Sequence, residues 1–432
     1  MTRDSGKSPF WKDIHILETL RGGGIFFIIK ILGSLGAYLF AWYVSKKYGA
    51  EGNGLLSFTL TAAVLLASTY NLGLNTYVVK IISAFRIQNN SGEANQFYRK
   101  ALATVTAVTL AGSCLLLILS RIWPESELSG DLYLVSLMTI PVSLMLFISQ
   151  TYRARKKILG HALLQNNVVQ FGALIVLLFP FWPGEKFSEP VWAFIIAGWI
   201  MCFAGLVFSR IDLLGSKIPE SKPFSTHIRE ALPMLAGGMA FILLSLSDRL
   251  MLRFLDTTAQ LGIYDIALRL SNITLLGILS LNAIAEPKYA EFHVARDMAR
   301  LRDFVKRTTW IGILISFPVI AVLGLFPQFW LGLFGDGDEF LTGTSSLLIL
   351  LIGQMAMVGC GSVLILLNMT GFQRSVQTML FATFMLNIAL NAVLIPKWGI
   401  EGAAGATAFS TVLWNIWGVW TIRRKLGLWM WR

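Results

Sequence analysis

The sequence has few charged residues. Only 14% of its 432 residues are Asp, Glu, Lys or Arg, whereas about a quarter are charged in an ordinary soluble protein. Hydrophobic residues make up 55% of the chain, and the mean hydropathy is +0.65. A soluble domain of this size has too little interior to bury so much apolar surface. The composition therefore excludes soluble, disordered and disulfide-rich secreted proteins.

Cysteine, histidine and catalytic motifs are also scarce. Cys114, Cys202 and Cys360 lie inside apolar runs, which leaves no disulfide framework and no zinc-binding spacing. The chain has no Gly-rich loop ending in Lys-Ser or Lys-Thr, no HExxH and no CxxC. One short acidic loop, with Asp336, Asp338 and Glu339, is either a weak cation site or a solvated turn. We expect no cofactor, no bound metal and no enzymatic activity.

The chain instead contains apolar runs of membrane-spanning length. A helix needs about 20 residues to cross a hydrocarbon layer of about 30 Å. No small-residue cleavage site follows the first run, so we interpret it as a retained membrane helix and not a signal peptide. We predict an all-α integral membrane protein with 12 transmembrane helices. They are expected at residues 25–45, 55–79, 101–120, 132–151, 162–182, 190–209, 232–255, 262–285, 308–330, 343–367, 376–395 and 402–422.

Basic residues are concentrated in alternate loops, which indicates the orientation. The opposite loops carry few of them, namely Lys46, Lys47, Arg121, Lys186 and Lys397. Loops rich in Lys and Arg remain in the cytoplasm, so both termini are predicted to be cytoplasmic. Tryptophans at the outer ends of the runs fit an interfacial aromatic belt: Trp42, Trp123, Trp182, Trp192, Trp330 and Trp398. The net charge of +12 then reflects topology, and no nucleic-acid partner is expected.

The two halves of the sequence are related by an internal repeat. Gly54, at the start of the second run, corresponds to Gly262 at the eighth, 208 residues later, and the turns at Gly160 and Gly371 are 211 residues apart. Two halves of six helices have the same orientation, so the pseudo-twofold axis lies along the membrane normal. The predicted divisions are a cytoplasmic N-terminus at 1–24, an N-lobe at 25–209, a cytoplasmic linker at 210–231, a C-lobe at 232–422 and a cytoplasmic C-terminus at 423–432.

Charged residues inside the predicted spans are the candidate functional residues, since each costs about 2.5 to 3.5 kcal/mol near the bilayer centre. They are Lys30, Asp248, Arg249, Arg253, Asp265 and Arg269. Asp265 and Arg269 are four residues apart with the acid first, which favours an ion pair on one helical face. If the seventh and eighth spans form an antiparallel hairpin, Asp248 lies level with Arg269, and Arg253 with Asp265. We therefore predict an Asp248–Arg269 salt bridge, with the four residues acting as intramembrane charge pairs.

This pairing leaves Lys30 and Arg249 without partners. We expect both to face a water-filled cavity between the lobes, because an unpaired cation in lipid is costly. Such a cavity suits an anionic substrate. Intramembrane polar residues either line it or form interhelical hydrogen bonds worth about 0.6 kcal/mol each; they are Asn166, Asn167, Gln170, Gln354, Asn387 and Asn391.

Several segments carry a family resemblance. The best are residues 48–75 (YGAEGNGLLSFTLTAAVLLASTYNLGLN), 247–250 (SDRL) with 261–269 (LGIYDIALR), 287–289 (PKY) and 398–405 (WGIEGAAG). With these patterns the chain resembles, over nearly its whole length, the Wzx-type polysaccharide flippases that export O-antigen and exopolysaccharide. These belong to the multidrug/oligosaccharidyl-lipid/polysaccharide exporter superfamily.

The resemblance implies two six-helix lobes that form a V-shaped central cavity, open alternately inward and outward. It also implies that the cargo is an undecaprenyl-diphosphate-linked oligosaccharide, carried from the cytoplasmic to the periplasmic leaflet of a bacterial inner membrane. Membrane lipids and the polysaccharide polymerase machinery are then the expected partners. The similar lipid II flippase branch carries cations on its first, second and eighth spans. Lys30 and Arg269 match two of these in placement, but the second span here lacks a buried arginine.

Lys30, Arg249 and Arg269 are accordingly the candidate substrate-binding residues. Lys30 lies about six residues, roughly 9 Å, from the inner end of the first span. Arg249 lies about six residues from the outer end of the seventh. We hypothesise that a diphosphate meets Lys30 first and passes to Arg249 as the lobes rock. The alternatives are a cation-coupled small-molecule or drug exporter of the same superfamily and a membrane enzyme of polysaccharide assembly.

Overall fold

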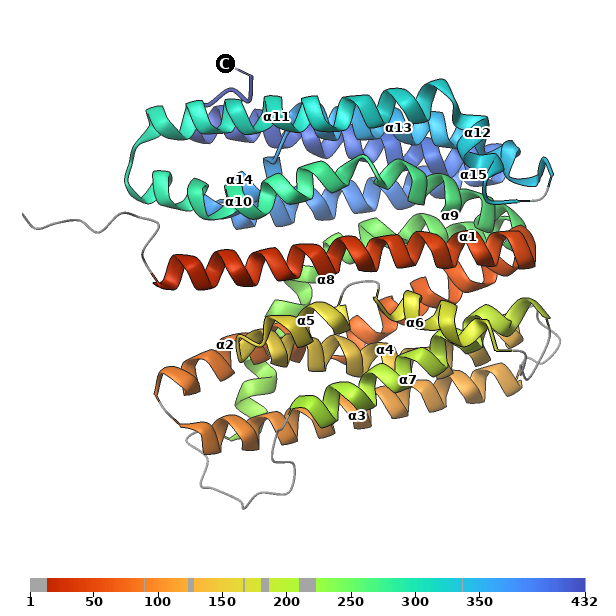
Figure 1. Cartoon of the computed structure of the whole chain (residues 1–432), viewed down its shortest axis with the longest axis horizontal. Helices are drawn as coiled ribbons and strands as arrows, with labels where there is room; N and C mark the ends of the chain where they lie inside the picture. Colours follow the sequence, from red (N-terminus) through yellow and green to blue (C-terminus); the bar gives the residue numbers. More distant parts are fainter. Residues whose placement is uncertain are drawn as a thin grey trace, which may run out of the picture.

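The fold is a bundle of long helices (Figure 1). The computed structural model describes residues 14–88, 90–122, 128–165, 168–179, 186–209, 223–335 and 337–431. Within these ranges every regular element is helical. The first half contains α1 (Ile14–Tyr70), α2 (Leu74–Ile87), α3 (Ser91–Ile122), α4 (Leu128–Ala154), α5 (Ile158–Gln165), α6 (Val168–Leu177), the short turn η2 (Lys186–Ser188) and α7 (Glu189–Ser209). The second half contains α8 (Phe224–Leu255), α9 (Thr258–Asn272), α10 (Leu275–Val294), α11 (Met298–Leu325), α12 (Pro327–Gly332), η3 (Glu339–Gly343), α13 (Thr344–Cys360), α14 (Val363–Met369) and α15 (Gln373–Leu426).

The two longest helices each contain a break at a glycine. α1 is interrupted at Gly49, where φ is 67°, and α15 at Gly399, where φ is 50°. Glycine adopts positive φ without the steric penalty of other residues. Both breaks have the local sequence aromatic–Gly–x–Glu–Gly, at Tyr48 and Trp398 respectively. Each long helix therefore consists of two segments joined by a tight turn.

The apolar helices confirm a multi-pass membrane protein. Seven described helices are long and apolar enough to cross a membrane, or eight if the bent α8 is counted as one span. The predicted runs 25–45 and 55–79 share α1, and the runs 376–395 and 402–422 share α15. The all-α fold is as predicted, whereas the number of 12 spans stays a prediction.

The helices pack into two lobes (Figure 1). One buried cluster joins α1, α4 and α7 through residues such as Phe40, Met138 and Phe194. Another is built mostly from the second half of the chain and includes Tyr264 and Leu347 of α9 and α13. Figure 1 shows α2 to α7 in one layer and α9 to α15 in the other, with the first segment of α1 between them.

Helix α8 belongs to both lobes. Ala231 in its first part is buried among Tyr77 and Tyr98 of the first lobe, and Ala240 in its second part joins a cluster of the second lobe. The helix bends by 50° between Leu235 and Gly238. Figure 1 shows it crossing from the lower layer to the upper one.

Several helices extend past the predicted divisions of the chain, which stay predictions. α8 begins at Phe224, directly after Pro223, inside the range 210–231 that the sequence suggested as a linker. α1 likewise begins within the range 1–24, and α15 continues to Leu426, past the predicted boundary at 422. Helices thus extend beyond the apolar runs, because polar turns at their ends keep helical hydrogen bonding. Residues 1–13 and 210–222 lie outside the described residues.

Candidate substrate site between the lobes

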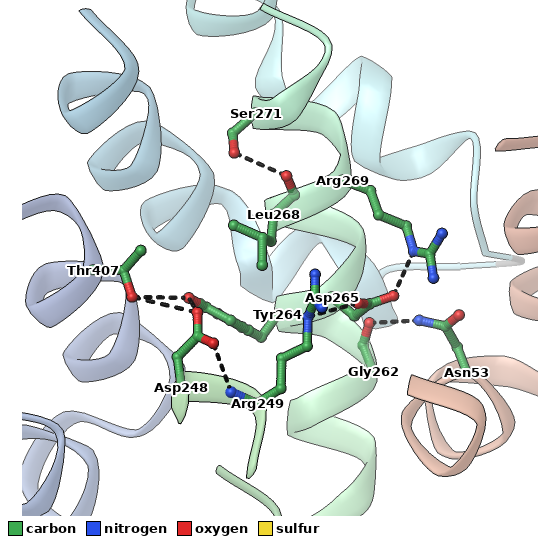
Figure 2. A network of polar contacts seen from close by, with 10 residues as sticks. All are labelled: Asn53, Asp248, Arg249, Gly262, Tyr264, Asp265, Leu268, Arg269, Ser271 and Thr407. Carbon is green, nitrogen blue, oxygen red and sulfur yellow. Dashed lines mark hydrogen bonds and ion pairs between the residues drawn. The ribbon is translucent and has the colours of Figure 1, made fainter. Parts of the chain in front are cut away.

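Two arginines share one aspartate at the centre of the candidate site (Figure 2). Asp265 of α9 has its Oδ1 3.1 Å from Nε of Arg249 on α8, and its Oδ2 2.6 Å from Nε of Arg269, one turn further along α9. The aspartate side chain is 1% exposed, whereas each arginine is 19% exposed. The group therefore has an excess of one positive charge, and its cations reach open space.

That space is a cavity of about 120 Å³ between the lobes. Its wall on one side is the second segment of α1, which contributes Ser57 and Thr61 among others. Its wall on the other side is formed by Arg249, Asp265 and Arg269. A small cavity whose charged wall is net positive can accept an anionic group, because a desolvated guanidinium binds phosphate or carboxylate oxygens strongly.

A second polar cluster lies behind this group, toward α15. Tyr264 donates a hydrogen bond of 2.5 Å to Oδ2 of Asp248, and the Thr407 hydroxyl donates to the same oxygen at 3.3 Å. The backbone N–H of Arg249 donates to Oδ1 at 2.8 Å. Hydroxyl and amide donors thus hold this buried carboxylate (Figure 2). Ser247 next to it donates to the Oδ1 of Asn387 on α15.

A third charge pair links the lobes directly. Arg253 near the end of α8 has its Nε 2.7 Å from Oδ2 of Asp131 in the first turn of α4, and both side chains are buried. The Arg253 guanidinium also lies over the ring of Phe58, 5.9 Å from its centroid. The pair therefore joins α4 and α1 of the first lobe to α8 of the second.

The lobes also meet closely through backbone near these residues. A methyl group added at Gly54 would lie 1.8 Å from the carbonyl oxygen of Thr258, and one added at Gly262 would lie 1.9 Å from that of Ala50. Asn53 donates from Nδ2 to the carbonyl oxygen of Gly262 at 2.9 Å. Only glycine allows helices α1 and α9 to approach so closely.

The charge pairing differs from the sequence-based one. The i,i+4 pair of Asp265 and Arg269 is present, but the predicted Asp248–Arg269 salt bridge is wrong, and Arg253 pairs with Asp131 instead of with Asp265. Arg249 is likewise not an unpaired cation. The hairpin model placed these residues by depth alone, whereas their direction around each helix decides which side chains meet.

Lys30 lies apart from the cavity. It is half-buried on the first segment of α1 and has no ion pair or hydrogen bond among the described residues. Tyr38, on the same helix eight residues later, donates to the backbone carbonyl of Arg269 at 2.7 Å. Eight helical residues span roughly 12 Å. The structure thus brings Arg249 and Arg269 together at the cavity, but not Lys30.

Some of the other polar residues of the spans form hydrogen bonds with neighbouring helices, and others bond within their own helix or stay buried. Gln354 donates to Asn272 at 3.2 Å, and Asn391 donates to Asn387, which in turn donates to Ser410. Gln170 is buried in α6. None of them lines the cavity described above. Asn166, Asn167 and Asp336 lie outside the described residues, while Glu339 accepts from the backbone N–H of Ala50.

Two important residues escaped the sequence analysis. Asp131 falls one position before a predicted span and so was not counted among the intramembrane charges. Tyrosine is common in membrane helices, so Tyr264 gives no sign in the sequence that it binds a buried carboxylate. An acid at a span boundary, close in depth to Arg253, was the available signal for Asp131.

Comparison with known proteins identifies the family. Residues 19–287 match the family model described as polysaccharide biosynthesis protein, and residues 233–393 match the MatE model. The chain belongs to the polysaccharide biosynthesis protein family. The superfamily predicted from the sequence, which joins polysaccharide flippases with multidrug exporters, is therefore confirmed.

The individual relatives have low sequence identity, but the matches cover most of the chain. A protein of Haloferax volcanii named as the probable low-salt glycan biosynthesis flippase Agl15 is 22% identical over 397 residues, which cover 89% of this chain and 79% of the relative. The solved lipid II flippase MurJ in an inward closed conformation superposes with a TM-score of 0.69 at 16% identity, over 94% of this chain and 87% of that one. An inward-facing multidrug resistance MATE transporter gives a TM-score of 0.68 at 12% identity, over 93% and 98%. These structures share the two-lobe fold, and the relatives are named as flippases and transporters, not as enzymes.

Proposed function

We propose that this protein is a flippase for a lipid-linked oligosaccharide of the undecaprenyl-diphosphate class. One observation carries the proposal: Arg249 and Arg269 share a single aspartate at a cavity between the lobes. A diphosphate is the anionic part of such a cargo, and it can engage both guanidinium groups in place of Asp265. The family and the flippase names of its relatives support the same class of substrate.

The shared aspartate suggests how the site accepts and releases its cargo. When the cavity is empty, Asp265 neutralises part of the charge of both arginines, which lowers the cost of holding them inside the membrane. An arriving phosphate offers several oxygens to the planar guanidinium groups and competes with the carboxylate. Because Asp265 stays within reach, it can reclaim the arginines when the head group leaves. Charge exchange of this kind favours transient binding, which transport requires.

The direction of transport is proposed to be from the cytoplasmic to the periplasmic leaflet, with alternating access between the lobes. Both described ends of the chain lie at the same end of the bundle (Figure 1), and the basic loops favour a cytoplasmic location for that end. Lys30 lies nearer that end than the cavity does, so it would meet an anionic head group first. The polymerase machinery of surface polysaccharide is the expected partner outside.

The test is export in a strain that lacks its own polysaccharide flippase. Arg249→Gln and Arg269→Gln should abolish surface polymer at normal protein abundance, whereas the lysine variants should retain part of it because a cation remains. Asn282→Ala, which removes a polar residue of α10 outside the cavity, serves as the matched control. Full export by the Arg249→Gln, Arg269→Gln double variant would refute a charge-based diphosphate site. Lys30→Gln should reduce the rate of export without abolishing it if Lys30 acts only in capture.

A second candidate is a cation-coupled exporter of small molecules. The buried carboxylate of Asp248, held by hydroxyl and amide donors, and the MatE match over residues 233–393 favour it. Drug resistance conferred on a susceptible strain, without restoration of surface polymer, would support this function over the flippase.

A further inference from the structure

A second, larger cavity opens between the lobes at the end of the bundle opposite the chain termini. Its volume is about 970 Å³. One wall comes from the first lobe, with Glu51 of α1, Tyr133 of α4 and Trp192 of α7. The other wall comes from the end of α8 and the turn into α9, with Asp256 and Thr258. We call this cavity the outer vestibule.

The outer vestibule and the arginine cavity lie one beyond the other along the same two helices. Arg249 lines the inner cavity and Arg253, one turn further along α8, lines the vestibule. On α1 the two positions follow in the opposite order along the chain: Glu51 lines the vestibule and Ser57 lines the inner cavity. Gly54, where α1 meets the backbone of α9, lies between these two α1 positions, and Arg253 and Asp131 form their ion pair on the vestibule side. The two spaces are therefore neighbours along the boundary between the lobes.

Aromatic rings form one part of the vestibule. The rings of Tyr133 and Trp192 meet at an angle of 61° with centroids 6.3 Å apart, and Tyr133 is 38% exposed. An interfacial belt tryptophan is expected to face lipid, but Trp192 lines a space between the two lobes. Aromatic rings that border a cleft suit a ligand with one apolar C–H face, which is the property of a pyranose ring.

Carboxylates form the other part. Glu51 is exposed, Asp256 is partly exposed, and both border the vestibule. Within the described residues no three His, Cys, Asp or Glu side chains come together as a metal site, so these acids do not form a cation cage. Carboxylates accept hydrogen bonds from neighbouring hydroxyl groups, and an acidic wall disfavours a phosphate. The chemistry of the vestibule thus complements that of the arginine cavity.

We propose that the outer vestibule binds the saccharide part of the cargo, with sugar rings against Tyr133 and Trp192 and sugar hydroxyls donating to Glu51 and Asp256. The proposal rests on the proposed flippase function. Pockets of about 300 to 1,000 Å³ hold ligands of drug size, and a short oligosaccharide is in this range. The arginine cavity then recognises the anionic head group, while the vestibule holds the sugar as it leaves.

Binding of a saccharide without lipid or phosphate tests the assignment. The probe is the free oligosaccharide that mild acid releases from the lipid-linked pool of the protein's own source cells, titrated against the full chain in nanodiscs by calorimetry. Trp192→Ala and Glu51→Gln should each weaken binding by about tenfold or more, as expected for loss of a central contact. Trp398→Ala is the matched control, because Trp398 is 58% exposed at the same end and does not line the vestibule. Thermal unfolding of each variant checks that it is folded.

The outcomes separate this proposal from the flippase function. If no saccharide binds, or if Trp192→Ala and Trp398→Ala bind alike, the vestibule is not a sugar site, even where Arg249→Gln abolishes export. If the vestibule variants weaken saccharide binding but the arginine variants leave export intact, the sugar site holds and the diphosphate site fails. Arg249→Gln should leave binding of the free saccharide unchanged, and a matching loss in that variant would overturn the division of roles.

Discussion

Gly54 and Gly262 occupy equivalent positions in the two internal repeats, and they pack against each other across the boundary between the lobes. A methyl group at Gly262 would lie 2.9 Å from the backbone nitrogen of Gly54 and 1.9 Å from the carbonyl oxygen of Ala50. Two elements related by a twofold axis can touch at equivalent residues only where they lie next to that axis. The pair therefore marks where the pseudo-twofold axis passes between the lobes.

Replacing Gly54 by alanine should push the lobes apart at this contact. Alanine is the better helix former, so α1 itself is not weakened, but its methyl group overlaps the backbone of α9. We expect the ratio of closed to open molecules to fall by about tenfold or more, which corresponds to about 1.4 kcal/mol. Pulsed EPR distances between spin labels at Lys47 and Thr342, in a background without native cysteines, measure the opening.

Gly405→Ala is the control for that experiment, since no atom lies within 4 Å of a methyl group added there. It should leave the distance distribution unchanged. An unaltered distribution in Gly54→Ala would show that the close approach of α1 and α9 is not what holds the lobes together at this contact.

Removing the shared carboxylate of Asp265 should destabilise the protein strongly. Asp265→Asn leaves Arg249 and Arg269 facing each other without an acid, and an uncompensated buried charge costs about 3 to 5 kcal/mol. Asp303→Asn breaks the exposed pair with Arg307 and should cost about 0.5 kcal/mol or less. Thermal unfolding in detergent compares the two. If both variants lowered the unfolding temperature by the same small amount, water would be solvating the two arginines in place of Asp265.

The link between Asp131 and Arg253 should respond to charge exchange. Each single variant, Asp131→Asn or Arg253→Gln, is expected to lose about 3 kcal/mol or more because the remaining buried charge loses its ion-pair partner. The exchanged variant, Asp131→Arg with Arg253→Asp, should recover part of that loss. A double-variant cycle of unfolding free energies measures the coupling, and a coupling of zero would refute the direct pair.

His161, ahead of the predicted span 162–182, should make stability depend on pH. Burial lowers the pKa of this histidine below its ordinary value of 6.5, and nearby Arg153 lowers it further, while a hydrogen bond to the carbonyl of Ser149 opposes both. The folded protein then binds fewer protons than the unfolded chain, so this contribution is complete above pH 6.5 and is lost as the pH falls through the lowered pKa. Unfolding temperatures between pH 8 and pH 5 should fall less steeply in His161→Gln. Parallel curves would contradict the assignment.

The sequence was sufficient for the fold class but not for the pairing of charges. Apolar runs and the repeat predicted an all-α, two-lobe membrane protein because hydrophobicity and period are properties of the chain itself. The pair of Asp265 and Arg269 was predictable since helix geometry alone brings the two together. Arg253 with Asp131 was not, because that contact depends on how α4 and α8 from different lobes lie against each other. The same reason hides the outer vestibule, whose residues are separated by up to about 200 positions in the chain.

The crossing of α8 between the lobes has a consequence for how the chain is made. One apolar cluster of the first lobe contains Ala231, and Tyr77 of that cluster donates a hydrogen bond to Glu230. Glu230 and Ala231 both come after α7, the last helix of that lobe. A growing chain that has inserted α1 to α7 still lacks these groups, and it also lacks the carbonyl of Ala231 against which Gly73 packs. Packing of this cluster is therefore complete only after the first part of α8 has been synthesised. A gene split after residue 209 would yield an N-terminal fragment that lacks Glu230 and Ala231. Co-expression of the remaining fragment should then complete the packing around Tyr77.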